Sequence, residues 1–305
     1  MRRLTLFLAG VAIVGNLAIA QDNRNDLRVM VVGLAARNYQ ESMDFYTKVM
    51  GFKAGFSFSS DGKRMNTYFQ LSRDSFIEMS ETAANAAPGF THIHMQTRDR
   101  DAVVARLQKS GVMVSNIRIA MPTMEKSATI TDPSGIRFEP TELIAGSMTK
   151  KAVDAWNESG FSPRVLVAGI AVKDYPASQN FYGKLMGFPV AFSFASADGQ
   201  RVTTYYQVSK ESFLEMQSAT EAMPAGITHV HIQVPDVAAA VARLRQLGLP
   251  APARGATTPK TATDPGVTQP SNVKSANVYD PQGLRLELNE LIPESQTKKA
   301  MDAWK

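Results

Sequence analysis

All four histidines of this 305-residue chain lie in two copies of one hexapeptide, residues 91–96 (THIHMQ) and 228–233 (THVHIQ). If each copy is a β-strand, residues two apart face the same side of the sheet. His92 and His94 then share one polar face. Imidazole binds transition metals and exchanges protons near neutral pH. Because the chain has no cysteine, any catalysis or metal binding must use imidazole and oxygen groups.

Carboxylates and arginines follow the same alternation on neighbouring predicted strands. Glu78 shares a face with Ser80, and Arg137 shares one with Glu139. The equivalent residues of the second copy are Glu215, His229, His231, Arg285 and Glu287. Such a face can hold a metal ion, line a metal-free binding cup, or form a buried hydrogen-bonded network with a purely structural role. The two arginines are candidates for binding a substrate carboxylate, or for pairing with the neighbouring glutamates.

The periodicity of the first half of the chain predicts one order of elements twice. The first module has a strand at 27–36, a helix at 38–50 and strands at 53–59, 64–72 and 76–80. Asn38 and Glu41 form a capping box, and Gly51 stops this helix. The second module has a strand at 91–97, a helix at 99–110 and strands at 117–120, 127–131 and 137–141. Each module is therefore βαβββ.

The chain is also a tandem duplication. Residues 42–58 match residues 178–194 at 10 of 17 positions, and residues 147–157 match residues 295–305 at 8 of 11. We therefore predict two domains, each large enough to bury its own core. The predicted divisions are a signal peptide at 1–20, a first domain at 27–145, a helix and linker at 146–163, a second domain at 164–292 and a C-terminal helix at 293–305.

Two arginines at positions 2 and 3 precede an apolar run, residues 4–20, that ends in Ala-Ile-Ala. This pattern is typical of a secretory signal peptide, the alternative being an uncleaved membrane anchor. We therefore expect an exported protein, periplasmic or secreted, with no membrane contact after cleavage. The formal net charge of +5 is too small and too scattered to indicate nucleic-acid binding. The expected partner is a small-molecule ligand, and the duplication lets the chain act as a monomer.

Three motifs carry a family resemblance: FYxKxMGF at 45–52, THI at 91–93 and DPxGxxxE at 132–139. They resemble the vicinal oxygen chelate (VOC) superfamily, which includes glyoxalase I, extradiol dioxygenases and bleomycin-binding proteins. The resemblance implies an α+β fold of four βαβββ modules, paired in two tandem domains. The curled mixed sheet of each domain is then expected to form a cup lined by the polar faces.

In metal-dependent relatives, four strands each project one ligand into the cup. Carried over to this chain, the resemblance implies the ligands Glu78, His92 and Glu139 in the first domain and Glu215, His229 and Glu287 in the second. The remaining position is Val31 or Val167, which cannot bind a metal, so His94 or His231 is the candidate replacement. The donor set suits a divalent Zn, Mn, Fe, Co or Ni ion.

The resemblance implies a metal-assisted lyase or isomerase of glyoxalase type, acting on a small molecule with vicinal oxygens. Glu139 and Glu287 are then the catalytic carboxylates that shuttle a proton. Extradiol ring cleavage is disfavoured. The iron of those enzymes resembles a site of two histidines and one glutamate, and it needs a histidine where Val167 stands. The alternative is a metal-free small-molecule binding protein of bleomycin-resistance type. The candidate substrate-binding residues are His94, His231, Arg137 and Arg285.

Overall fold

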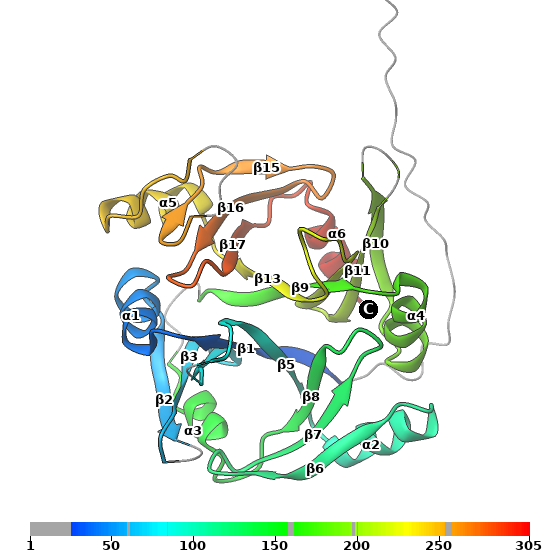
Figure 1. Cartoon of the computed structure of the whole chain (residues 1–305). Helices are drawn as coiled ribbons and strands as arrows, with labels where there is room; N and C mark the ends of the chain where they lie inside the picture. Colours follow the sequence, from blue (N-terminus) through cyan, green and yellow to red (C-terminus); the bar gives the residue numbers. More distant parts are fainter. Residues whose placement is uncertain are drawn as a thin grey trace, which may run out of the picture.

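The computed structural model describes residues 26–59, 62–83, 85–157, 162–196, 199, 201–253 and 258–305. The predicted signal peptide lies outside these residues. Two open, curved sheets form the molecule, one from each half of the chain (Figure 1). Among the helices described, none is both long and apolar enough to cross a membrane.

The first sheet has the order β2-β3-β4-β1-β5-β8-β7-β6. Its strands are β1 (Arg28–Ala36), β2 (Lys53–Ser59), β3 (Met65–Ser72), β4 (Ser75–Glu81), β5 (Gly89–Thr97), β6 (Val114–Ala120), β7 (Glu125–Thr131) and β8 (Arg137–Glu142). Its helices are α1 (Tyr39–Asp44), η2 (Phe45–Val49), α2 (Arg100–Lys109) and α3 (Met148–Asp154). The α+β class and the paired βαβββ modules are confirmed. Since β1 pairs with β5, the two modules of one unit join each other rather than exchanging with the other unit.

The second sheet repeats this order as β10-β11-β12-β9-β13-β17-β16-β14, with β15 paired to β16. Its strands are β9 (Arg164–Val172), β10 (Val190–Ala195), β11 (Val202–Ser209), β12 (Ser212–Ser218), β13 (Gly226–Gln233), β14 (Thr261–Ala262), β15 (Gly266–Thr268), β16 (Val273–Tyr279) and β17 (Arg285–Glu290). Its helices are α4 (Tyr175–Gln179), η3 (Asn180–Leu185), α5 (Val237–Gln246) and α6 (Gln296–Ala303).

The predicted helix at 38–50 changes its hydrogen-bond pattern halfway. Asn38 caps it by accepting a hydrogen bond from the Glu41 amide, as the capping box predicts. From Phe45 onward the helix is a π-helix, which buries Phe45 and Tyr46. A π-turn points its side chains in directions that differ from those in an α-helix. Here the turn directs Tyr46 toward the other unit.

Reciprocal hydrogen bonds join the two units. The Tyr46 hydroxyl donates to Asp280 at 3.0 Å, and the equivalent Tyr182 donates to Asp132 at 2.8 Å. Both carboxylates lie in the D-P-x-G turns of the opposite unit. One apolar core runs through both units between the sheets, with β1 and β9 side by side near its centre (Figure 1). The polar faces of the two sheets are therefore turned away from this shared core.

Helix α3 covers part of the polar, concave side of the first sheet. Ala152 and Val153 of this helix pack against a separate apolar cluster that includes Val31, Tyr68 and Phe76. Helix α6 packs in the same way on Val167, Tyr205 and Phe213 of the second sheet. Each cup is thus partly filled by apolar contacts, and its polar groups are confined to the centre of the sheet.

Candidate metal centre

The two histidines of the first unit lie at the centre of its sheet. Strand β5 carries both, between β1 on one side and β8 on the other. In the strand register, His92 lies opposite Gly33 of β1, and His94 lies opposite Val31. On the β8 side His94 pairs with Glu139. The alternation of β5 therefore places both imidazoles on the concave face.

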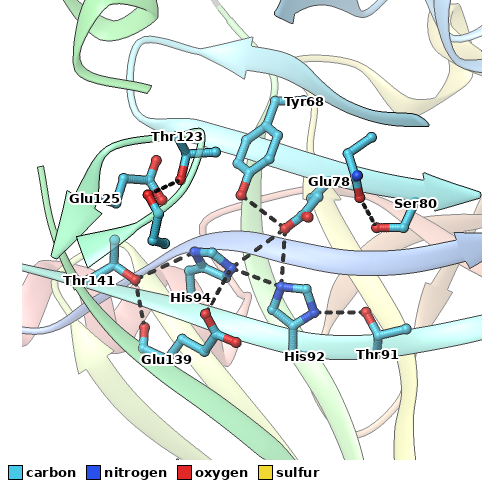
Figure 2. A network of polar contacts seen from close by, with 12 residues as sticks. Tyr68, Glu78, Ser80, Thr91, His92, His94, Thr123, Glu125, Glu139 and Thr141 are labelled. Carbon is cyan, nitrogen blue, oxygen red and sulfur yellow. Dashed lines mark hydrogen bonds and ion pairs between the residues drawn. The ribbon is translucent and has the colours of Figure 1, made fainter. Parts of the chain in front are cut away.

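Four side chains meet at this point (Figure 2). The Nε2 atoms of His92 and His94 are 2.8 Å apart. A carboxylate oxygen of Glu78 lies 3.1 Å from His92 Nε2 and 3.5 Å from His94 Nε2. A carboxylate oxygen of Glu139 lies 3.6 Å from His94 Nε2. The first unit thus brings two imidazoles and two carboxylates to one place.

The second unit repeats this geometry. The Nε2 atoms of His229 and His231 are 2.8 Å apart. Glu215 lies 3.3 Å from the first imidazole and 3.2 Å from the second. Glu287 lies 3.8 Å from His231 Nε2. The two copies of the duplicated unit thus have nearly the same donor geometry.

These spacings fit a shared metal ion. Donor atoms bound at about 2.0–2.2 Å with angles between octahedral and tetrahedral lie about 2.8–3.6 Å apart. All distances within the set Glu78, His92 and His94 fall in this interval. In each unit the ligand atoms of the Glu/His/His set lie within 4.8 Å of one another. The described part of the chain thus contains two candidate sites for a divalent ion.

Further hydrogen bonds orient the imidazoles. The Nδ1 atoms of His92 and His229 each lie 2.8 Å from the hydroxyl of the preceding threonine. His231 Nδ1 donates to Asn289 Oδ1 at 2.6 Å. A bond of this kind fixes the direction of the ring, and where Nδ1 is the donor, as in His231, the lone pair of Nε2 is left for a metal. The outer hydrogen bonds therefore support the same ligand atoms as the distances do.

A glycine on β1 makes room for the first imidazole. A Cβ atom at Gly33 would lie 2.3 Å from His92 Cε1, and one at Gly169 would lie 2.1 Å from His229 Cε1. Both distances are far below ordinary van der Waals contact. The ring of each histidine thus lies directly over a glycine backbone. This role was not predicted from the sequence, although a glycine within a buried apolar strand indicates a close approach.

The charges of the cluster favour ionised carboxylates. Burial opposes ionisation of Glu78, but His92 and His94 outweigh it and lower the pKa of Glu78 to about 2. The Tyr68 hydroxyl also donates to this carboxylate at 2.9 Å. Burial lowers the pKa of His94. A neutral imidazole beside an ionised carboxylate is the state that binds a cation.

The residues carried over from the resemblance lie as follows. Glu78 and His92 belong to the three-residue set, and His94 completes it beside Val31. Glu139 lies at the outer limit of the spacing for a ligand, and its other oxygen is 3.2 Å from Arg137 Nε. In the second unit, burial opposes ionisation of Glu287, but His231, His229 and Arg285 lower its pKa. No direct observation tests these ligand assignments, which stay predictions.

The fold and the donor sets together define a tandem β-cup protein with one candidate metal site in each half. The family model of the Glyoxalase/Bleomycin resistance protein/Dioxygenase superfamily matches residues 28–139 and 164–288. The chain therefore belongs to this superfamily, as the resemblance indicated. No curated protein matches the sequence.

Solved structures of similar fold cover both units. The 2,3-dioxygenase LapB from Pseudomonas sp. KL28 is 16% identical, with a TM-score of 0.68 over 89% of this chain and 96% of that one. The Mn(II)-bound glyoxalase from Novosphingobium aromaticivorans is 16% identical, with a TM-score of 0.64 over 87% and 83%. The halotolerant catechol dioxygenase BphC is 16% identical, with a TM-score of 0.64 over 88% of each chain. At this identity the likeness concerns the fold.

Proposed function

We propose that each unit binds one divalent transition-metal ion, and that the loaded protein is a lyase or isomerase acting on a small molecule with vicinal oxygens. The ligands of the first unit are Glu78, His92 and His94, and those of the second are Glu215, His229 and His231. The convergence of two Nε2 atoms and one carboxylate in both units carries this proposal.

A bound ion would polarise two neighbouring substrate oxygens and stabilise an enediolate. The chain itself supplies the proton transfer. Glu139 lies beside the ligand set with one oxygen toward His94 and the other toward Arg137, so its carboxylate can take a proton from carbon and return it. The side chain of Arg137 is 46% exposed and can bind a substrate carboxylate. Glu287 and Arg285 have the same roles in the second unit.

The size of the substrate is restricted. The side chains of Glu78, His94 and Glu139 are only 6–14% exposed. A cavity of about 560 Å³ in the first unit is lined mostly by polar residues such as Arg28 and Gln96, together with Leu143 and Val153, and by none of the proposed metal ligands. Gln96 lies two residues beyond His94 on β5, on the same face. The low exposure of the ligand set therefore favours a compact substrate over a bulky one.

Extradiol ring cleavage is the second candidate function. The sequence disfavours this function because Val167 stands at the position of a histidine ligand. In the structure His231 lies opposite Val167 in the strand register and supplies a second imidazole from the neighbouring strand. Two histidines and one carboxylate with open positions form the donor set of non-haem iron(II) oxygenases. With His231 as the proposed second imidazole ligand, the valine at position 167 does not exclude this function.

Metal binding separates these functions from a metal-free binding protein. The full chain is freed of metal with a chelator and titrated with Mn²⁺, Zn²⁺, Ni²⁺ and Fe²⁺. We expect two ions per chain, one after His94→Ala or His231→Ala, and two after Glu81→Gln, a control on the same strand as Glu78. The loaded forms are then assayed with 2-oxoaldehydes and, under oxygen, with catechols. A chain that binds no ion at stoichiometric amounts would refute the metal site and leave the bleomycin-resistance type of binding.

We also propose that residues 1–20 direct export and are then removed. The basic start, the apolar run and the small residues at its end support this. The test is the mass and N-terminal sequence of the protein recovered from the periplasm or medium of an expressing bacterium. A chain that stays in the cytoplasm with its first residues intact would contradict the proposal.

A further inference from the structure

A third carboxyl group faces the cup of the first unit and takes no part in the site described above. Glu125 lies at the start of β7 and is 1% exposed. On this strand Ser127 pairs with Thr141 of β8, and Thr131 pairs with Arg137, so the odd-numbered positions share the concave face with Glu139. Glu125 therefore belongs to the same polar face as the metal ligands.

Hydroxyl groups hold this carboxyl group in place. The Thr149 hydroxyl of α3 donates to one oxygen, and Thr123 provides a second hydrogen bond (Figure 2). The charged groups that act on it are the carboxylates of Glu78 on β4 and Glu139 on β8. Burial first, and then these two negative charges, raise the pKa of Glu125 to about 7. Glu125 thus exchanges its proton at neutral pH, whereas Glu78 is fully ionised there.

The second unit lacks this group. Lys126 lies opposite Glu142 in the first sheet, and Lys274 lies opposite Glu290 in the second. The two lysines are therefore equivalent positions, and so are the residues that precede them. Glu125 of the first unit corresponds to Val273 of the second. The metal ligands are the same in both units, but only the first has an ionisable group at this position of the cup.

We infer that Glu125 is a proton-exchanging group of the first unit's metal centre, and that the second unit has no equivalent. The inference rests on the proposed metal sites. Entry of a cation near three carboxyl groups favours ionisation of the protonated one, so the O–H bond of Glu125 breaks and its proton leaves to solvent. A protonated substrate group can then transfer its own proton to the free carboxylate, and that group leaves in its deprotonated form. The two units consequently differ in acid–base capacity although they share a donor set.

The test counts the protons released when Mn²⁺ binds at pH 7 in weakly buffered solution. A His229→Ala background confines the ion to the first unit, and a His92→Ala background confines it to the second. In the first background we expect the parent to release about half a proton more per ion than Glu125→Gln, because a group with a pKa near 7 is about half protonated. In the second background Glu125→Gln should have no effect.

Two further variants guard against misfolding and unrelated titration. Glu125→Val copies the residue of the second unit and should remove the same fraction of a proton. Asp280→Asn removes a buried acid at the boundary between the units and should leave the metal-linked release unchanged. Equal proton release with and without Glu125, at full Mn²⁺ stoichiometry, would overturn this inference alone. Absence of Mn²⁺ binding would overturn both this inference and the proposed function.

Discussion

Replacing Gly33 by alanine should damage the first metal site without changing any ligand. An alanine Cβ at this position would lie 2.3 Å from His92 Cε1 and 2.4 Å from His92 Nδ1. Ordinary contact begins at about 3.4 Å, so the ring must retreat by about 1.1 Å. Metal–ligand bonds tolerate deviations of only about 0.2 Å. The displaced Nε2 atom therefore leaves the coordination sphere.

The expected loss is a 10- to 100-fold weaker affinity of the first unit for Mn²⁺, the range found when ligand-orienting groups are removed. The assay is a competition titration against a chelator in the His229→Ala background. Gly89→Ala is the matched control, because Gly89 lies on β5 with His92 and an added Cβ there meets nothing within 4 Å. Without a clash, alanine in a strand is favoured over glycine by about 0.5–1 kcal/mol.

The same reasoning applies to the second unit, where a Cβ at Gly169 would lie 2.1 Å from His229 Cε1. Gly169→Ala should weaken that site, and Gly266→Ala, which meets nothing within 4 Å, should not. Circular dichroism must show that all variants fold. If folded Gly33→Ala binds Mn²⁺ as tightly as Gly89→Ala, then His92 is not a ligand in the observed rotamer.

Three other outcomes follow from named contacts. Tyr46→Phe should lower the free energy of unfolding by about 1–3 kcal/mol in urea, because it leaves a buried oxygen of Asp280 without its donor. Burial raises the pKa of Asp280 from 3.8 to about 6, so this group favours the folded state below pH 4 and loses that contribution as the pH rises through 6. The stability difference between Asp280→Asn and the parent should therefore increase by about 2 kcal/mol from pH 4 to pH 7. A constant difference would contradict the burial effect. Asn289→Ala should weaken Mn²⁺ binding in the second unit 10- to 100-fold, because His231 loses its hydrogen-bond partner at 2.6 Å. Thr141→Ala should have less effect on Mn²⁺ binding in the first unit, because it removes a contact of only 3.5 Å to His94.

Local patterns sufficed for most of the fold. The alternation at 53–59 predicts β2 with its observed ends, and the capping box places the start of α1 correctly. The change to a π-helix at Phe45 was not predicted, nor was the contact of the buried Tyr46 with Asp280, which is 234 residues away in the chain. Local periodicity contains no information about such a contact.

The sequence predicts which side chains share a face of the sheet, but not the distances between their ligand atoms. Alternation places His92 and His94 on one side, but the convergence of their Nε2 atoms depends on the register of β5 against β1. Glu125 was missed for a local reason. The predicted strand began at Ser127, whereas β7 begins at Glu125, so the carboxyl group fell outside the alternation that would have placed it in the cup.

The strand register explains how each proposed metal site can form without a ligand on the first strand of its unit. Val31 cannot bind a metal, but His94 lies directly opposite it, across an antiparallel pair whose side chains are close neighbours. His92, two residues earlier, can turn its Nε2 toward the same point only because Gly33 leaves room beneath its ring. Val31, Gly33 and the His-x-His spacing thus depend on one another in the proposed site. A histidine introduced at position 31 would compete with His94 for the same space, so it should not restore a four-ligand site unless His94 is also made smaller.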